Sequence, residues 1–132
     1  MPGLGDDLGP RHRAAPTEAQ VAAYIGADNV GEFSAHARAV GRHGIVVPGP
    51  MLTAYLEQFV RSELPSWRVE RLATTFRVPT IAGTELVLTG AITEHHEAAD
   101  AERLVCDLVI EHRDGERAVT GTATLIKFVD SR

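Results

Sequence analysis

The 132-residue sequence predicts a single domain of the α+β class, with one long helix packed against an antiparallel sheet. Two observations support this prediction. Between about Pro50 and Glu63 the apolar residues recur at helical spacing, and after Pro65 the apolar period shortens toward two. Because an amphipathic helix must bury its apolar stripe, we expect this helix to lie across the sheet.

The first segment of the chain, residues 1–15, is rich in Gly, Pro and charged residues and shows no apolar period. We expect it to form an extended, partly loose lead-in to a single domain over residues 16–132. A first helix is predicted over Thr17–Ile25, because Thr17-Glu18-Ala19-Gln20 fits a capping box. The glycines that follow are expected to end this helix and to begin a loop that runs to about Gly44.

The second helix is predicted over about Pro50–Glu63. Its first turn follows Gly49, and the peptide dipoles there direct partial positive charge toward any carbonyl or anion in front of the helix. The apolar residues on its buried face are Met51, Leu52, Tyr55, Leu56, Phe59 and Val60.

Four antiparallel strands are predicted after this helix, because four segments rich in Val, Ile, Thr and Leu are separated by turn residues. Asp114-Gly115, between the last two, is a short-hairpin signal. The only cysteine, Cys106, is expected to be a small buried hydrophobe in the third strand, and a disulfide within the chain is excluded. The four segments are Arg68–Val78, Thr84–Glu94, Arg103–His112 and Arg117–Phe128.

Composition excludes several classes of function. A formal net charge of −5 and a single lysine argue against a nucleic-acid partner. No window reaches the roughly 20 apolar residues that cross a bilayer, and the N-terminus has no secretory pattern, so we expect a cytoplasmic protein with no membrane contact. Neither glycine-rich nucleotide fingerprint occurs, and no cofactor is predicted.

An ordered set of segments between Pro16 and Phe128 resembles the MaoC-like hotdog proteins, which hydrate or dehydrate acyl thioesters. The resemblance implies a sheet wrapped around a central helix, dimers joined edge to edge, and an acyl tunnel at the subunit interface. The expected substrate is an acyl-CoA or an acyl group on acyl carrier protein, and the expected partner is a second hotdog chain in a homodimer or heterodimer. The segments are Ala23–Asn29, Gly44–Met51, Phe76–Leu86 and Gly115–Ala123.

The resemblance further implies that the backbone N–H of Gly49 polarises the thioester carbonyl. Electrostatics supports this role independently, because negative charge develops on that oxygen when the α-proton leaves. The alternative interpretation is that Gly49 and Pro50 simply begin a helix.

The acid and base of the family are absent. Active hydratases carry Gly, Asp, any residue, Asn, Pro, any residue, His, but here Ala27, Val30 and Glu32 stand at the Asp, Pro and His positions. In one interpretation Asp28 moves in as the base, and Glu32 or His36 supplies the second proton site.

A second interpretation, which we favour, resembles the family's heteromeric enzymes. This chain would be the subunit without the dyad, which shapes the acyl tunnel beside a partner that carries the dyad. The third interpretation is other chemistry in the same cavity, as in a thioesterase, isomerase or cyclase. A subunit that binds or supports without any chemistry is the rival from a different class.

The remaining candidates have structural interpretations. His95 and His96 are expected in a turn and to point apart, so no metal site is predicted. His112 is expected to be exposed at a strand end. Trp67 and Phe76 are expected to be core residues or dimer-interface anchors.

Overall fold

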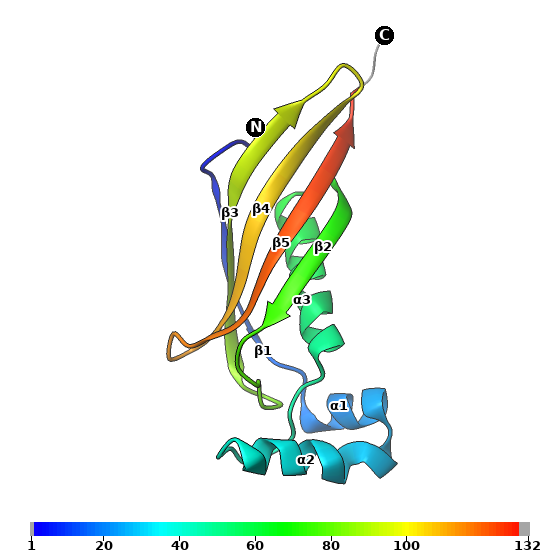
Figure 1. Ribbon diagram of the computed structural model, residues 1–132, viewed down its shortest axis with the longest axis vertical. Helices are drawn as coiled ribbons and strands as arrows, with labels where there is room; N and C mark the ends of the chain where they lie inside the picture. The colour runs from blue at the N-terminus through cyan, green and yellow to red at the C-terminus, as the bar shows by residue number, and fades with distance from the viewer. Residues whose placement is uncertain (1, 130–132) are drawn as a thin grey trace.

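The computed structural model describes residues 2–129, and in these a five-stranded antiparallel sheet packs against one long helix (Figure 1). The helix is α3 (Gly49–Glu63), and the strands lie in the order β1-β3-β4-β5-β2. This arrangement confirms the predicted α+β class. The strands are β1 (Asp7–Ala14), β2 (Arg68–Phe76), β3 (Glu85–Glu97), β4 (Ala101–His112) and β5 (Arg117–Phe128).

The N-terminal segment is part of the sheet. Residues Asp7–Ala14 form β1, which pairs antiparallel with β3 at one edge. This part of the expected extended lead-in is therefore a paired edge strand and is not loose. The apolar period is missing because Leu8 is the one buried residue of this strand. Residue 1 of the expected lead-in and residues 130–132 of the expected domain lie outside the described residues.

The helices before α3 lie together at one end of the sheet, below the start of α3 in Figure 1. The first, α1 (Glu18–Ile25), begins with the predicted capping box: the Gln20 N–H donates to Thr17 Oγ1 and the Thr17 N–H donates to Gln20 Oε1. The predicted loop after it instead contains a 3-10 turn, η1 (Ala27–Asn29), and a helix, α2 (Val30–Ala39).

The sequence prediction missed α2 because the glycines near its start outweighed its alanines. Alanine is the strongest helix former, and Ala37 is also fully buried. The long helix and the four predicted strands are confirmed within a few residues. The second of these four, β3, continues to Glu97, so His95 and His96 lie in a strand and not in a turn.

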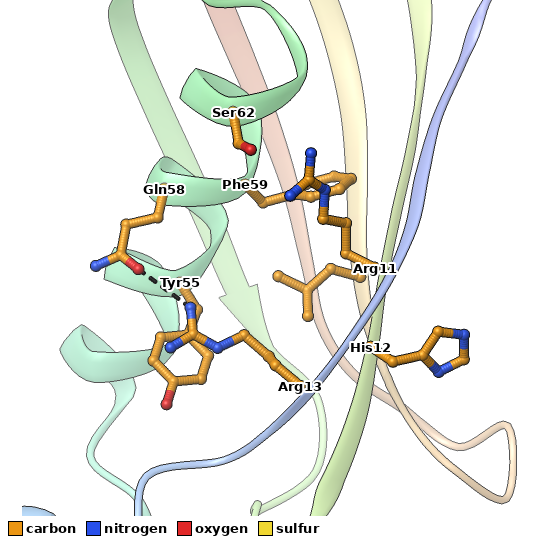
Figure 2. Close-up of a pocket in the computed structure, with 8 residues that line it drawn as sticks. Arg11, His12, Arg13, Tyr55, Gln58, Phe59 and Ser62 are labelled. Atoms are coloured by element: carbon orange, nitrogen blue, oxygen red, sulfur yellow. Dashed lines mark hydrogen bonds between the residues drawn. The ribbon is translucent and has the colours of Figure 1, made fainter.

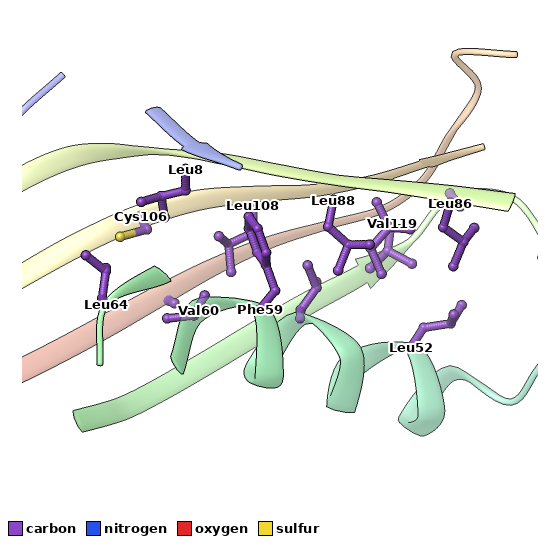
Figure 3. Close-up of a cluster of buried hydrophobic side chains, with 14 of the residues drawn as sticks. Leu8, Leu52, Phe59, Val60, Leu64, Leu86, Leu88, Cys106, Leu108 and Val119 are labelled. Atoms are coloured by element: carbon purple, nitrogen blue, oxygen red, sulfur yellow. The ribbon is translucent and has the colours of Figure 1, made fainter. Parts of the chain in front are cut away.

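The core lies between α3 and the inner face of the sheet (Figure 3). Burial raises the pKa of the Cys106 thiol to about 11, with a smaller contribution from the Asp107 carboxylate, as expected for a packing residue. No helix among the described residues is long and apolar enough to span a membrane. The buried residues of α3 are Leu52, Leu56, Phe59 and Val60.

The substitution Leu56→Ala tests this packing. Leu56 is fully buried, so we expect the free energy of unfolding to fall by about 2–5 kcal/mol in urea denaturation. The matched control is Leu4→Ala, because Leu4 is exposed and its truncation should change stability by no more than about 0.5 kcal/mol. Equal losses in the two variants would contradict a core centred on α3.

Candidate functional site

An apolar cavity of about 270 Å³ opens beside the first turn of α3. One wall is the chain entering the helix, and the other is the segment that follows β2. Segments far apart in the sequence therefore meet at this cavity, and the start of α3 belongs to its lining. The lining residues are Val46, Val47, Gly49, Leu52, Phe76, Arg77, Val78, Pro79 and Thr80.

The first turn of α3 has no side-chain cap. Pro48 occupies the N-cap position and offers no side-chain acceptor, and the turn contains no acidic residue. Among the described residues, no acceptor receives a hydrogen bond from the Gly49 N–H. This donor and the positive end of the helix dipole therefore remain available at the cavity wall.

Gly49 also allows an aromatic ring to approach the helix. A Cβ atom added at Gly49 would lie 2.6 Å from Cζ of Phe76, closer than two carbon atoms can pack. The Phe76 side chain is 51% exposed, so this residue covers the helix start rather than filling the core. Trp67, by contrast, is buried in the core as expected.

A polar chain lies behind the Thr80 end of the cavity, buried at Thr80 and His112 and partly exposed at Glu116 and Arg42. The His112 ring bonds Thr80 Oγ1 through Nε2 and Glu116 Oε1 through Nδ1, each at 2.9 Å. The Arg42 guanidinium donates to the same Glu116 oxygen at 2.9 Å. His112 is only 5% exposed, which corrects the expectation of an exposed residue.

Sequence reasoning missed this polar chain because its members come from three separate segments. Thr80 and His112 are 32 residues apart, and Arg42 and Glu116 are 74 apart. The hydrogen bond from Arg42, with the further bond from His112, lowers the pKa of the Glu116 carboxyl below its usual value. The carboxylate is thus the stable form in the folded protein.

The predicted acid and base candidates lie on the helices below the sheet. Asp28 is in η1, and Glu32 and His36 are in α2; all three are exposed, and none lines the cavity at Gly49. The His36 ring lies 6.0 Å from the Phe33 ring, centroid to centroid. Their catalytic role stays a prediction.

Among residues 2–129, two groups of side chains have the geometry to hold a metal ion. At the end of the β3–β4 hairpin, His95 Nε2 lies 3.8 Å from Glu97 Oε1 and 3.7 Å from Glu102 Oε1. Glu102 comes from β4, and sequence reasoning missed it because strand register brings it opposite Glu97. The second group is His112, Asp114 and Glu116, where Arg42 already pairs with the Glu116 carboxylate.

A second cavity, of about 300 Å³, lies between β1 and α3 (Figure 2). Its floor includes Phe59 and its rim carries two arginines. The Arg13 guanidinium lies 3.3 Å from the Tyr55 ring centroid and donates to Gln58 Oε1, while Arg11 pairs with Glu63 at 2.9 Å. These contacts tie β1 to α3.

The substitution Glu116→Gln tests the charge on the polar chain. The folded-state pKa is lowered, so the carboxylate stabilises the fold above its unfolded pKa of about 4.3, and this contribution disappears as the pH falls through the folded-state pKa. We expect the variant to be less stable than the original protein at about pH 7, with the difference shrinking toward about pH 3. Urea denaturation at several pH values measures it, and a difference independent of pH would contradict the ionised pair.

Known proteins match this chain through structure. At the level of sequence, no family model and no curated protein matches it. The ChsH1-ChsH2 complex from Mycobacterium tuberculosis matches with 19% identity and a TM-score of 0.75, over 95% of this chain and 98% of that chain. The (R)-hydratase from A. caviae, involved in PHA biosynthesis, matches with 20% identity and a TM-score of 0.75, over 96% and 97%.

A third match is the HadBC complex, a (3R)-hydroxyacyl-ACP dehydratase from Mycobacterium tuberculosis, with 20% identity and a TM-score of 0.72, over 93% of this chain and 96% of that chain. Identities of this size show the shared fold. The chain has the hotdog fold, and its predicted structural resemblance to MaoC-like hydratases and dehydratases is confirmed over nearly its full length.

Proposed function

We propose that this chain binds an acyl thioester, on coenzyme A or on acyl carrier protein, as one subunit of a heteromeric enoyl-thioester hydratase or 3-hydroxyacyl dehydratase. The observation that carries the proposal is the uncapped N–H of Gly49 in the wall of an apolar cavity. The second subunit would be a hotdog chain that carries the Asp and His of the family.

The chemistry of the reaction fits this cavity. Negative charge develops on the thioester oxygen when the α-proton leaves in dehydration, or when the oxygen of water adds to the β-carbon in hydration. A fixed N–H at a helix start stabilises that charge where it develops. The apolar side chains of Val46, Val78 and Leu52 would contact the acyl group. Binding and carbonyl polarisation are thus the two roles that this chain's own groups support.

The proton transfers of the reaction favour a second subunit as the source of the acid and the base. Hydration moves a proton at the α-carbon and another at the hydroxyl, which calls for a positioned base and acid. The lining residues at Gly49 include no carboxylate and no imidazole, and Asp28, Glu32 and His36 do not line this cavity. A second chain that supplies both groups would complete the site, and two of the structural matches are solved as complexes.

The substitution Gly49→Ala tests the binding role. The added methyl group would displace the Phe76 ring and the cavity wall, and an extra carbon forced into such a packed contact typically costs about 1–3 kcal/mol. We expect crotonyl-CoA to bind at least about tenfold more weakly by isothermal titration calorimetry. The matched control is Gly31→Ala, where an added Cβ meets no atom within 4 Å.

A hydration assay with crotonyl-CoA tests the division of roles. The chain alone should be inactive, and activity should appear when a hotdog chain with the full Asp and His pattern is added. Activity of the lone chain that is lost in Asp28→Asn, Glu32→Gln or His36→Gln would overturn the heteromeric proposal in favour of an internal dyad. Inactivity both alone and with the partner would overturn the hydratase role.

A further inference from the structure

We infer that the hydrogen-bonded polar chain Arg42–Glu116–His112–Thr80 positions the start of α3, which makes His112 a positioning residue for the ligand that binds at Gly49. This inference deepens the proposed function and rests on it only for the identity of the ligand. The chain joins the segment before α3, the segment after β2, and the β4–β5 hairpin.

The protonation of His112 follows from its partners. A carboxylate only accepts hydrogen bonds, so His112 Nδ1 carries a proton and donates to Glu116. In the neutral ring Nε2 is then an acceptor, and the Thr80 hydroxyl donates to it. Thr80 is 1% exposed, and both nitrogens of the ring are satisfied, so the chain holds Thr80 in one orientation.

The charges around the ring are balanced within the same cluster. Glu116 accepts from Arg42 as well as from His112, and its own N–H donates to Asp114 Oδ1. Asp114 is thereby held in the hairpin turn beside the ring. The Arg42 guanidinium thus compensates the charge of the Glu116 carboxylate.

Thr80 transmits this position to the helix start through the backbone. Its carbonyl accepts from the Val47 N–H at 2.8 Å, and Val47 is two residues before Gly49. The next pair repeats the contact: the Ala82 N–H donates to the Ile45 carbonyl at 2.8 Å, and Val46 and Ile81 form an antiparallel bridge. The two walls of the cavity, residues 45–47 and 80–82, are thus joined by a short stretch of antiparallel backbone pairing. The hydrogen bond from Thr80 to His112 fixes one end of this pairing.

Hydrogen exchange tests the inference without a ligand. Thr80→Val keeps the side-chain shape and removes the hydroxyl, so the Val47 amide should exchange at least about fivefold faster by NMR. Thr80→Ser should restore the original rate. The matched control is His96→Gln, because His96 also lies 2.9 Å from a glutamate, Glu94, but on the exposed end of β3.

Ligand binding is the second readout. We expect crotonyl-CoA to bind about fivefold more weakly to Thr80→Val and to His112→Gln, with recovery in Thr80→Ser and no change in His96→Gln. If His112→Gln does not fold, the comparison of Thr80→Val with Thr80→Ser tests the inference instead. Global stability, measured by urea denaturation, separates local opening at Val47 from general loss of structure.

Each result bears on the inference. Unchanged Val47 exchange in a folded Thr80→Val variant would overturn it, and so would acceleration equal to that of amides throughout the sheet. If the original protein binds no crotonyl-CoA, the proposed function fails at that point. The exchange rates of the Val47 amide still test the positioning role in that case. Failure of the proposed function and failure of this inference are therefore distinguishable.

Discussion

Burial of one face of α3 by the sheet is the constraint on which the other features of this fold depend. Leu56 and Val60 are fully enclosed, and they face side chains such as Leu108 on the inner surface of the sheet. A close-packed interface of this kind fixes both the rotation and the depth of the helix, because any shift would leave voids or clashes. The first turn of α3 therefore has a fixed place at one end of the sheet, next to the segment that leaves β2.

That fixed place gives the helix start its chemical character. Proline before the helix removes the usual side-chain cap, and glycine at its first position lets the Phe76 ring approach where any Cβ would interfere. Burial of α3 against the sheet thus leaves a polar helix end in an apolar setting. An N–H group in such a setting interacts more strongly with a carbonyl oxygen than it would in water, because less solvent competes with it.

The same end of the molecule separates binding groups from ionisable groups. The cavity wall is mostly apolar, and Arg77 is the one charged residue among those that line it. The buried imidazole behind it, His112, has both ring nitrogens bonded to Thr80 and Glu116. A ring held in this way supports structure rather than exchanging protons with a substrate. This separation supports the proposal that this chain binds the thioester and that a second chain transfers the protons.

The sequence by itself determined the elements whose signals are local. The apolar stripe of α3, the alternation in the strands and the capping box at Thr17 each depend on residues within a few positions of one another, and the Gly49 helix start follows from the same local pattern. Only the tertiary structure decided the rest. The edge strand β1 exists because β3 offers it hydrogen bonds, and His112 is buried because Thr80, Glu116 and Arg42 converge on one cluster from distant segments. Such contacts leave no periodic pattern in the sequence, since the fold brings the partners together only after the helix and sheet have packed.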